Sequence, residues 1–272
     1  MYEIGLSTCG KIVDENLFRT FSESGIKHME ISLTPQEYHN FDYRITKEYA
    51  SFYGVNLWSF HLPFYPFSEI ELSDKALCNE TLNYYAELIK KASAIGLDKF
   101  VVHPSGEPLE NAERYDRMEC SKESLYFLAE LAKKCGGIVA VEDLPRTCLG
   151  NNSDEILELV SVHDDLKVCF DTNHLLSENV CDFVRKIGNK IVTIHVSDCD
   201  FTDEKHWLPG EGKINWQDLL HTLKEVGYSG VWMYEIPFEN TAKIQRNREL
   251  ICEDFVKNAN EIFANIPFTI IR

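Results

Sequence analysis

Basic residues are scarce in this sequence. Its 272 residues include 27 lysines and arginines against 44 aspartates and glutamates, so the formal net charge is −17 with the histidines neutral. Phosphate backbones and anionic membrane surfaces repel a strongly acidic chain, which argues against a nucleic-acid partner and against membrane association. With 44% hydrophobic and 26% charged residues, the composition is typical of a folded protein and argues against disorder.

Long apolar runs, a signal sequence and paired cysteines are also absent. No run approaches the roughly 18 apolar residues of a membrane span. The N-terminus lacks the basic stretch and apolar run of a signal peptide. The 9 cysteines are scattered, and none forms a Cys-x-x-Cys pair. This pattern argues against a thiolate zinc site and a disulfide framework, and it predicts a reducing, cytoplasmic location.

Short apolar runs alternate with longer amphipathic segments along the whole chain. Eight runs are strand candidates, and several are continuously hydrophobic, as in parallel strands that are buried on both faces. They are Ile4–Ser7, His28–Ser32, Leu57–His61, Phe100–His103, Ile138–Glu142, Val168–Asp171, Ile191–His195 and Val231–Glu235. The helices expected between them include one from Asp74 to about Ile95, Lys122–Cys135, one starting at Ser153, Trp216–Val226 and Arg248–Phe263.

This alternation predicts the fold. Eight strands, each followed by a helical segment, have the size and rhythm of a (β/α)8 TIM barrel, an α/β fold, here as a single domain over residues 1–272. A doubly wound open sheet is the alternative. It would normally carry a glycine-rich phosphate loop after the first strand. The segment Ser7-Thr8-Cys9-Gly10 offers one glycine only, which favours the barrel.

The residues that end the predicted strands carry the functional signal. Six strands end in a side chain that can bind a metal or transfer a proton: His61, His103, Glu142, Asp171, His195 and Glu235. In a barrel these ends meet at one mouth. A charged group directly after a buried run is costly unless it is paired or metal-bound. Four successive strands supply three carboxylates and one imidazole, a set that suits one divalent ion such as Mn²⁺, Co²⁺ or Mg²⁺ and tolerates Zn²⁺.

Other segments contribute further candidates. Glu204 and His206 are two residues apart in the long irregular stretch 196–215, so either could reach the mouth. The Pro-Gly-Glu-Gly sequence at 209–212 predicts a turn that brings the backbone close to another group. The aromatic stretch from Trp58 to Phe67 could form the wall of a sugar pocket. Glu30, near the end of the second strand, could be a seventh such strand-end residue and could contact a substrate, but the preferred interpretation is a solvated residue.

Several short motifs contain these residues. They are His-Leu-Pro at 61–63, Val-His-Pro at 102–104, Val-Glu-Asp-Leu at 141–144, Phe-Asp-Thr-Asn-His at 170–174, His-Val-Ser-Asp at 195–198, His-Trp-Leu-Pro-Gly-Glu-Gly-Lys-Ile-Asn-Trp at 206–216 and Tyr-Glu-Ile at 234–236. Their succession over nearly the whole chain resembles the xylose isomerase-like TIM barrels. That superfamily includes the sugar phosphate isomerases/epimerases and the endonuclease IV group.

The resemblance to the isomerases and epimerases implies a site and a reaction. Four residues would bind one divalent metal: Glu142, Asp171, His195 and Glu235. Glu142 and Glu235 would also act as base and acid on opposite sides of a small sugar, polyol or sugar phosphate, by proton transfer through an enediolate that the metal stabilises. His174 would form a hydrogen bond with a substrate oxygen.

One position departs from the pattern of several such epimerases. They have an acidic residue six positions after the first glutamate, whereas this chain has Cys148 there. Arg146 lies nearby and could bind a substrate hydroxyl or phosphate. With His174, Trp58 and Glu211, it completes the set of predicted substrate-binding residues.

Three other functions remain open. The endonuclease IV pattern implies three zinc ions and cleavage of abasic DNA, and its ligands would include the additional residues His61, His103, His174, Glu204 and His206. The expected mouth loops are acidic or aromatic, whereas a DNA enzyme needs lysine or arginine there. An inosose-type dehydratase would begin with the same proton removal, and a non-catalytic sugar binder would not need paired carboxylates. The predicted partner is therefore a small sugar or polyol, and a homo-oligomer remains possible.

Overall fold

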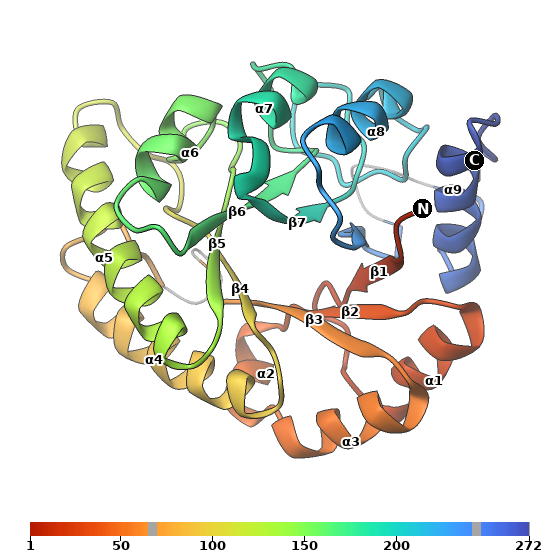
Figure 1. The fold of residues 1–272 in the computed structure, drawn as a ribbon, viewed down its shortest axis with the longest axis horizontal. Coiled ribbons are helices and arrows are strands. Elements are labelled where there is room, and N and C mark those ends of the chain that lie inside the picture. Colours follow the sequence, from red (N-terminus) through yellow and green to blue (C-terminus); the bar gives the residue numbers. More distant parts are fainter. Residues whose placement is uncertain (65–69, 241–245, 272) are drawn as a thin grey trace.

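The described residues form a ring of parallel strands surrounded by helices. The computed structural model describes residues 1–64, 70–240 and 246–271 (Figure 1). The strands are β1 (Ile4–Ser7), β2 (His28–Ile31), β3 (Asn56–His61), β4 (Lys99–Val102), β5 (Ile138–Glu142), β6 (Leu166–Asp171), β7 (Ile191–His195) and β8 (Trp232–Tyr234).

Neighbouring strands pair in the order β7-β6-β5-β4-β3-β2-β1-β8. The ring closes where the backbone N–H of Val196 donates to the carbonyl of Met233, with an N···O distance of 2.7 Å. The predicted (β/α)8 barrel is therefore confirmed.

The helices follow the strands around the outside of the ring. They are α1 (Glu15–Ser24), α2 (Pro35–Asn40), α3 (Tyr43–Tyr53), α4 (Cys78–Ala94), α5 (Arg114–Lys134), α6 (Ser153–Val160), α7 (Val180–Ile187), a 3₁₀ turn (Gly188–Lys190), α8 (Trp216–Glu225) and α9 (Cys252–Ala264). Short polar side chains cap several of them. Asp14, Asp42 and Asn152 accept hydrogen bonds from first-turn N–H groups of α1, α3 and α6. No helix in the described ranges is long and apolar enough to cross a membrane.

Some helix boundaries differ from the prediction. Helix α4 begins at Cys78 rather than Asp74, because the Asp74 carbonyl accepts from Leu77 and Cys78 and thereby closes a separate turn. Helix α5 begins at Arg114, eight residues before the predicted Lys122. Its first turns bury Met118, Cys120 and Ser121, and these side chains give only a weak hydrophobic pattern.

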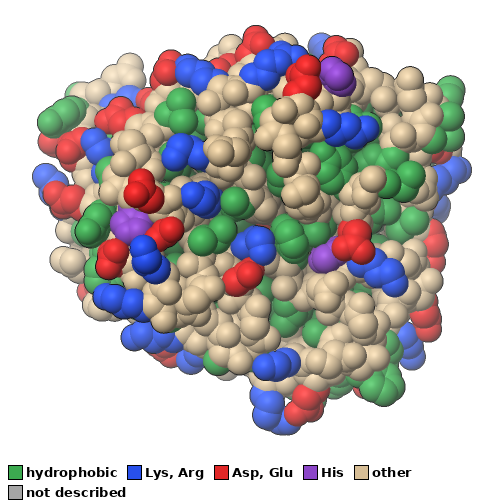
Figure 2. Space-filling model, viewed as in Figure 1, with side chains coloured by type: hydrophobic (Ala, Val, Ile, Leu, Met, Phe, Trp, Pro, Cys, Tyr) green, Lys and Arg blue, Asp and Glu red, His purple; other side chains and the backbone are tan. Residues whose placement is uncertain are grey.

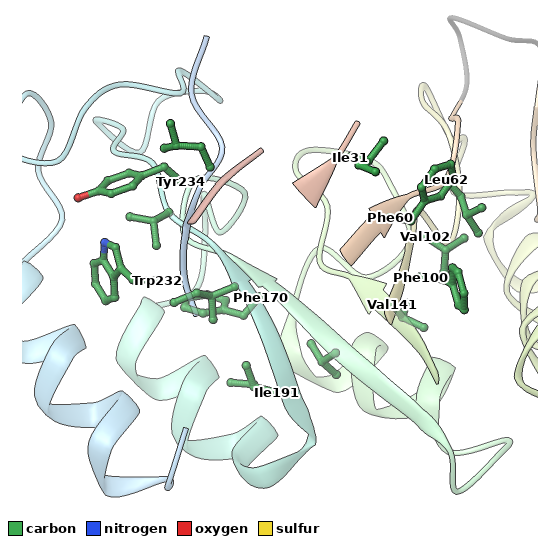
Figure 3. Close-up of a cluster of buried hydrophobic side chains, with 14 of the residues drawn as sticks. Ile31, Phe60, Leu62, Phe100, Val102, Val141, Phe170, Ile191, Trp232 and Tyr234 are labelled. Carbon is green, nitrogen blue, oxygen red and sulfur yellow. The ribbon is translucent and has the colours of Figure 1, made fainter. Parts of the chain in front are cut away.

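The pleat of the strands separates the hydrophobic core from the site. Large side chains such as Phe100 and Phe170 pack between the strands and the helices (Figure 3). The residues that alternate with them along the strands point to the opposite face and form a separate buried cluster, which includes Ala140 and Cys169. Glu142 and Asp171 lie two residues further along β5 and β6, so their side chains point to the same face as those of Ala140 and Cys169. The alternation that fills the barrel interior therefore also turns these carboxylates toward its mouth.

Charged side chains are dispersed over the visible surface. Figure 2 shows a face on which lysine and arginine side chains lie among aspartates and glutamates. On that face the basic residues form no continuous surface of the kind that binds a phosphate backbone.

A buried carboxylate holds together the long loop after β7. Asp198 is fully buried. It accepts hydrogen bonds from the backbone N–H groups of Cys199, Gly210 and Ile214 at 2.9, 2.8 and 3.1 Å, and from the indole of Trp216 at 3.0 Å. A Cβ at Gly212 would lie 2.3 Å from an Asp198 carboxylate oxygen, so glycine is required there. The predicted close approach of the 209–212 turn is thus an approach to Asp198.

Replacing Asp198 should therefore destabilise the protein. Asp198→Ala leaves several buried donors without an acceptor, and we expect it to lower the free energy of unfolding by about 3–5 kcal/mol. Asp182→Ala, which removes an exposed carboxylate on α7 beside Arg185, is the matched control and should have little effect. Urea denaturation checks both variants, and equal stability of the two would contradict this role for Asp198.

Candidate metal centre

Four side chains from successive strands meet at the mouth of the barrel. Glu142, Asp171 and His195 end β5, β6 and β7, and Glu235 follows β8. Each offers a ligand atom, and these atoms all lie within 4.8 Å of one another. Nδ1 of His195 is 3.0 Å from Glu142 Oε1 and 3.3 Å from Glu235 Oε2. The structure thus brings together the residues that the resemblance assigned to one metal.

Burial and charge act in opposite directions on these acids. Burial favours the neutral form of Glu142, but His195 and His103 hold its pKa well below the usual range. Burial likewise opposes ionisation of Glu235, and His195 nevertheless lowers its pKa. For Asp171 burial wins, reinforced by Glu235, and the pKa is raised well above the ordinary value. The imidazole therefore balances only part of the negative charge that the three carboxylates can carry.

The residues fit a divalent cation. Oδ2 of Asp171 is buried and has no hydrogen-bond partner among the described residues. Three carboxylates and one imidazole are a common donor set for Mn²⁺, Co²⁺, Mg²⁺ or Zn²⁺. An unpartnered buried oxygen beside two further carboxylates is costly without a positive charge nearby.

Further candidate ligands flank this group on both sides. Nε2 of His61 and Nε2 of His103 lie 3.1 and 3.2 Å from Glu142 Oε2. On the other side His174, Glu204 and His206 form a cluster of their own.

The histidines of these flanking groups are oriented by backbone carbonyls. Nδ1 of His61, His174 and His206 is 2.8, 2.7 and 3.0 Å from the carbonyl of Leu62, Asp143 and Glu235, respectively. Since a carbonyl oxygen only accepts, each Nδ1 carries a hydrogen, and Nε2 is the nitrogen that could bind a metal. Burial opposes the charged form of His61 and His206, but Glu142 and Glu204 beside their Nε2 atoms raise the pKa of each ring to about 9, so a metal there would displace a proton.

A cavity of about 640 Å³ opens onto the site. Phe64 lines it and stacks on His103 with ring centroids 4.3 Å apart. Arg146 also lines it, as predicted, but its guanidinium already contacts Glu107, Asp203 and Glu204. These contacts join three loops of the mouth.

Three interpretations of single residues need correction. Trp58 is not at the mouth, because β3 reaches the mouth only at His61. The Trp58 indole donates to Thr193 Oγ1 at 3.1 Å and lines a different cavity with Glu3. The aromatic stretch 58–67 has two further aromatic residues at positions 65 and 67, and these lie outside the described residues. Glu211 is buried against Arg246, with N···O distances of 2.8 and 3.0 Å, and so holds two loops together instead of facing a substrate.

Glu30 is the third correction. It is fully buried rather than solvated, and its Oε2 lies 3.0 Å from His195 Nε2. It also accepts a hydrogen bond from the Ser59 hydroxyl at 2.7 Å. The signal that could have identified it is the one used for the other strands, an acid at the end of a buried apolar run.

Comparison with known proteins places this site in a family. Residues 18–254 match the model of a family described as xylose isomerase-like TIM barrel. The chain belongs to this family. The crystal structure of a D-tagatose 3-epimerase-like protein matches 98% of both chains with a TM-score of 0.81 at 24% identity, in agreement with the barrel fold.

Some of the proteins that are similar in sequence to this chain are named enzymes. D-psicose 3-epimerase of Ruminiclostridium cellulolyticum is 25% identical over 254 residues, which cover 87% of this chain and 82% of that protein. Inosose isomerase of Halalkalibacterium halodurans is 28% identical over 177 residues, which cover 60% of this chain and 61% of that protein. The uncharacterized protein MJ1311 of Methanocaldococcus jannaschii is 28% identical over 211 residues, which cover 74% and 70% of the two chains.

Metal binding should release protons. Burial alone would lower the pKa of His195, but the acids around it, among them Glu235 and Glu30, raise it well above its ordinary value. The metal-free protein therefore holds a protonated His195 at pH 7, and a metal can bind Nδ1 only after that proton leaves. The affinity for Mn²⁺ should consequently rise with pH.

Calorimetry in buffers of different ionisation enthalpy measures the release. We expect at least one proton per bound ion at pH 7, from His195, and a second from Asp171 where burial keeps that carboxyl protonated. A heat of binding that is independent of the buffer would contradict the protonated state of His195.

Proposed function

We propose that the protein is a divalent-metal-dependent isomerase or epimerase of a small sugar or polyol. The observation that carries the proposal is the position of Glu142 and Glu235, which both line the cavity and whose ligand atoms lie within 4.8 Å of each other and of those of Asp171 and His195. The family assignment and the epimerases and isomerases among the relatives support the same reaction class.

The paired carboxylates match what this chemistry requires. Isomerisation or epimerisation removes a proton next to a carbonyl and returns one to another carbon or to the opposite face. The lowered pKa values of Glu142 and Glu235 keep both groups ionised, so either can accept the first proton. The acid that forms can return this proton to a neighbouring carbon. Return to the opposite face requires that the other glutamate first takes up a proton from a substrate hydroxyl or from water. The four ligands would hold the metal, which when bound supplies Lewis-acid polarisation of the substrate carbonyl. His174, with Nε2 available, would bind a substrate oxygen.

The charges around the cavity favour an uncharged substrate. Among the described residues that line it, Arg146 is the only lysine or arginine, and three carboxylates already surround its guanidinium. A sugar phosphate would need a cation that is available for the phosphate. The acidic lining therefore supports a free ketose or polyol over its phosphate ester.

Replacing either glutamate should abolish turnover. For Glu142→Gln and Glu235→Gln we expect kcat to fall by about 10²–10⁴-fold on whichever ketose or inosose the wild type converts, because the amide cannot take up a proton. Glu239→Gln, at an exposed carboxylate beside Lys11, is the control and should retain activity.

The metal content of each variant is measured in parallel, because both residues are also proposed ligands. Full activity in both glutamine variants would rule out the two-carboxylate mechanism.

A second candidate is a trinuclear phosphodiesterase acting on abasic DNA. The observation in its favour is that His61, His103 and Glu142 on one side, and His174, Glu204 and His206 on the other, could each hold an additional ion. The acidic surroundings of Arg146 oppose it, because phosphates need basic contacts.

Metal analysis and a cleavage assay distinguish the two functions. We expect no cleavage of an abasic-site duplex at moderate salt, with zinc or manganese supplied. Cleavage that is lost in His206→Ala, together with three ions per chain, would overturn the isomerase proposal.

A further inference from the structure

The second nitrogen of the His195 ring faces a carboxylate that the proposed mechanism does not use. Nδ1 points toward Glu142 and Glu235, whereas Nε2 lies 3.0 Å from Glu30 Oε2. Glu30 lies near the end of β2, three strands away from β7 around the ring through β8 and β1. Both side chains are completely buried.

The chemistry of this contact fixes the tautomer of the ring. Carboxylate oxygens accept hydrogen bonds, and they lie beside both ring nitrogens, so in the metal-free protein Nε2 donates to Glu30 while Nδ1 donates toward Glu142 and Glu235. Nδ1 is the nitrogen that faces the other three ligand residues, so a metal would take the place of the hydrogen on Nδ1 while Nε2–H still donates to Glu30. The partner carboxylate also draws on the Nε2 hydrogen, which makes Nδ1 a stronger donor to a metal.

Glu30 is itself held in place for this contact. The Ser59 hydroxyl donates to the same oxygen, Oε2, at 2.7 Å. The other oxygen, Oε1, is buried and has no hydrogen-bond partner among the described residues. A carboxylate with one oxygen unsatisfied contributes poorly to stability by itself. The position of Glu30 is therefore better explained by its contact with Nε2 of His195.

We propose that Glu30 is a positioning residue that keeps His195 in the Nε2–H form and thereby sets the affinity of the site for its metal. This inference rests on the metal centre of the proposed function. Glu30 would not contact the metal or the substrate. Its effect would appear in metal affinity, and in activity only through metal occupancy.

The chain offers a matched control for testing this role. Glu3 Oε2 lies 2.7 Å from Nε2 of the buried His28, the same pair of groups at a histidine outside the metal-competent clusters, with the Glu3 side chain 69% exposed where Glu30 is buried. Glu30→Gln and Glu3→Gln thus make the same chemical change to a glutamate–histidine pair. Glu30→Asp, which keeps the charge but withdraws the carboxylate from Nε2, serves as a second variant if Glu30→Gln fails to fold.

Titration of the metal-free proteins with Mn²⁺ measures the affinity directly. For Glu30→Gln and Glu30→Asp we expect the dissociation constant to rise by about 10–100-fold, with Glu3→Gln unchanged. Thermal unfolding of the metal-free variants provides the readout for a purely structural role, which would lower their melting temperature while leaving the affinity intact. The absorption spectrum of bound Co²⁺ should also change in the Glu30 variants, because the orientation of its imidazole ligand is altered.

The outcomes separate this inference from the proposed function. An unchanged Mn²⁺ affinity in a folded Glu30 variant, with tight binding by the wild type, would overturn the role of Glu30 alone. A wild type that binds no divalent ion would overturn both the metal centre and the inference built on it. An equal loss of affinity in Glu3→Gln would show that the effect is not specific to His195 and would also overturn it.

Discussion

The balance of charge around His195 is the interaction on which the mouth of the barrel depends. Carboxylates approach this imidazole on both of its nitrogens, with Glu142 and Glu235 at Nδ1 and Glu30 at Nε2. Buried negative charge at this density is unfavourable unless positive charge or hydrogen-bond donors offset it. The protonated imidazole supplies part of the offset, and under the proposed function a divalent cation supplies the rest when His195 gives up its proton.

The barrel and much of the site could be predicted because both depend on short-range patterns. Continuous apolar runs specify buried parallel strands, and helices of the expected size separate them. Once the barrel is accepted, residues as far apart as Glu142 and Glu235 become neighbours without further information. Among the strand-end residues expected at the mouth for this reason, His61, His103, Glu142 and Glu235 line the cavity, and His206 reaches it from the loop after β7.

The errors concern side chains whose surroundings come from distant parts of the chain. The direction of Trp58 depends on its depth in β3, next to a register irregularity between β2 and β3. Glu211 finds its partner in Arg246, 35 residues later, and Glu30 finds His195 at a separation of 165 residues. No local pattern identifies the distant partner of such an acid, although the position of Glu30 at the end of a buried apolar run does indicate that it is not solvated. Arg146 lines the cavity, but its three acidic neighbours come from distant loops and leave no signal in the local sequence.

The most direct test of this account is the anomalous diffraction of crystals grown with Mn²⁺. One strong peak is expected at the mouth of the barrel, within coordination distance of side-chain atoms of Glu142, Asp171, His195 and Glu235. The His195 ligand atom should be Nδ1, with Nε2 still in contact with Glu30. The absence of a peak in this cluster, or an ion that Nδ1 of His195 does not coordinate, would contradict it.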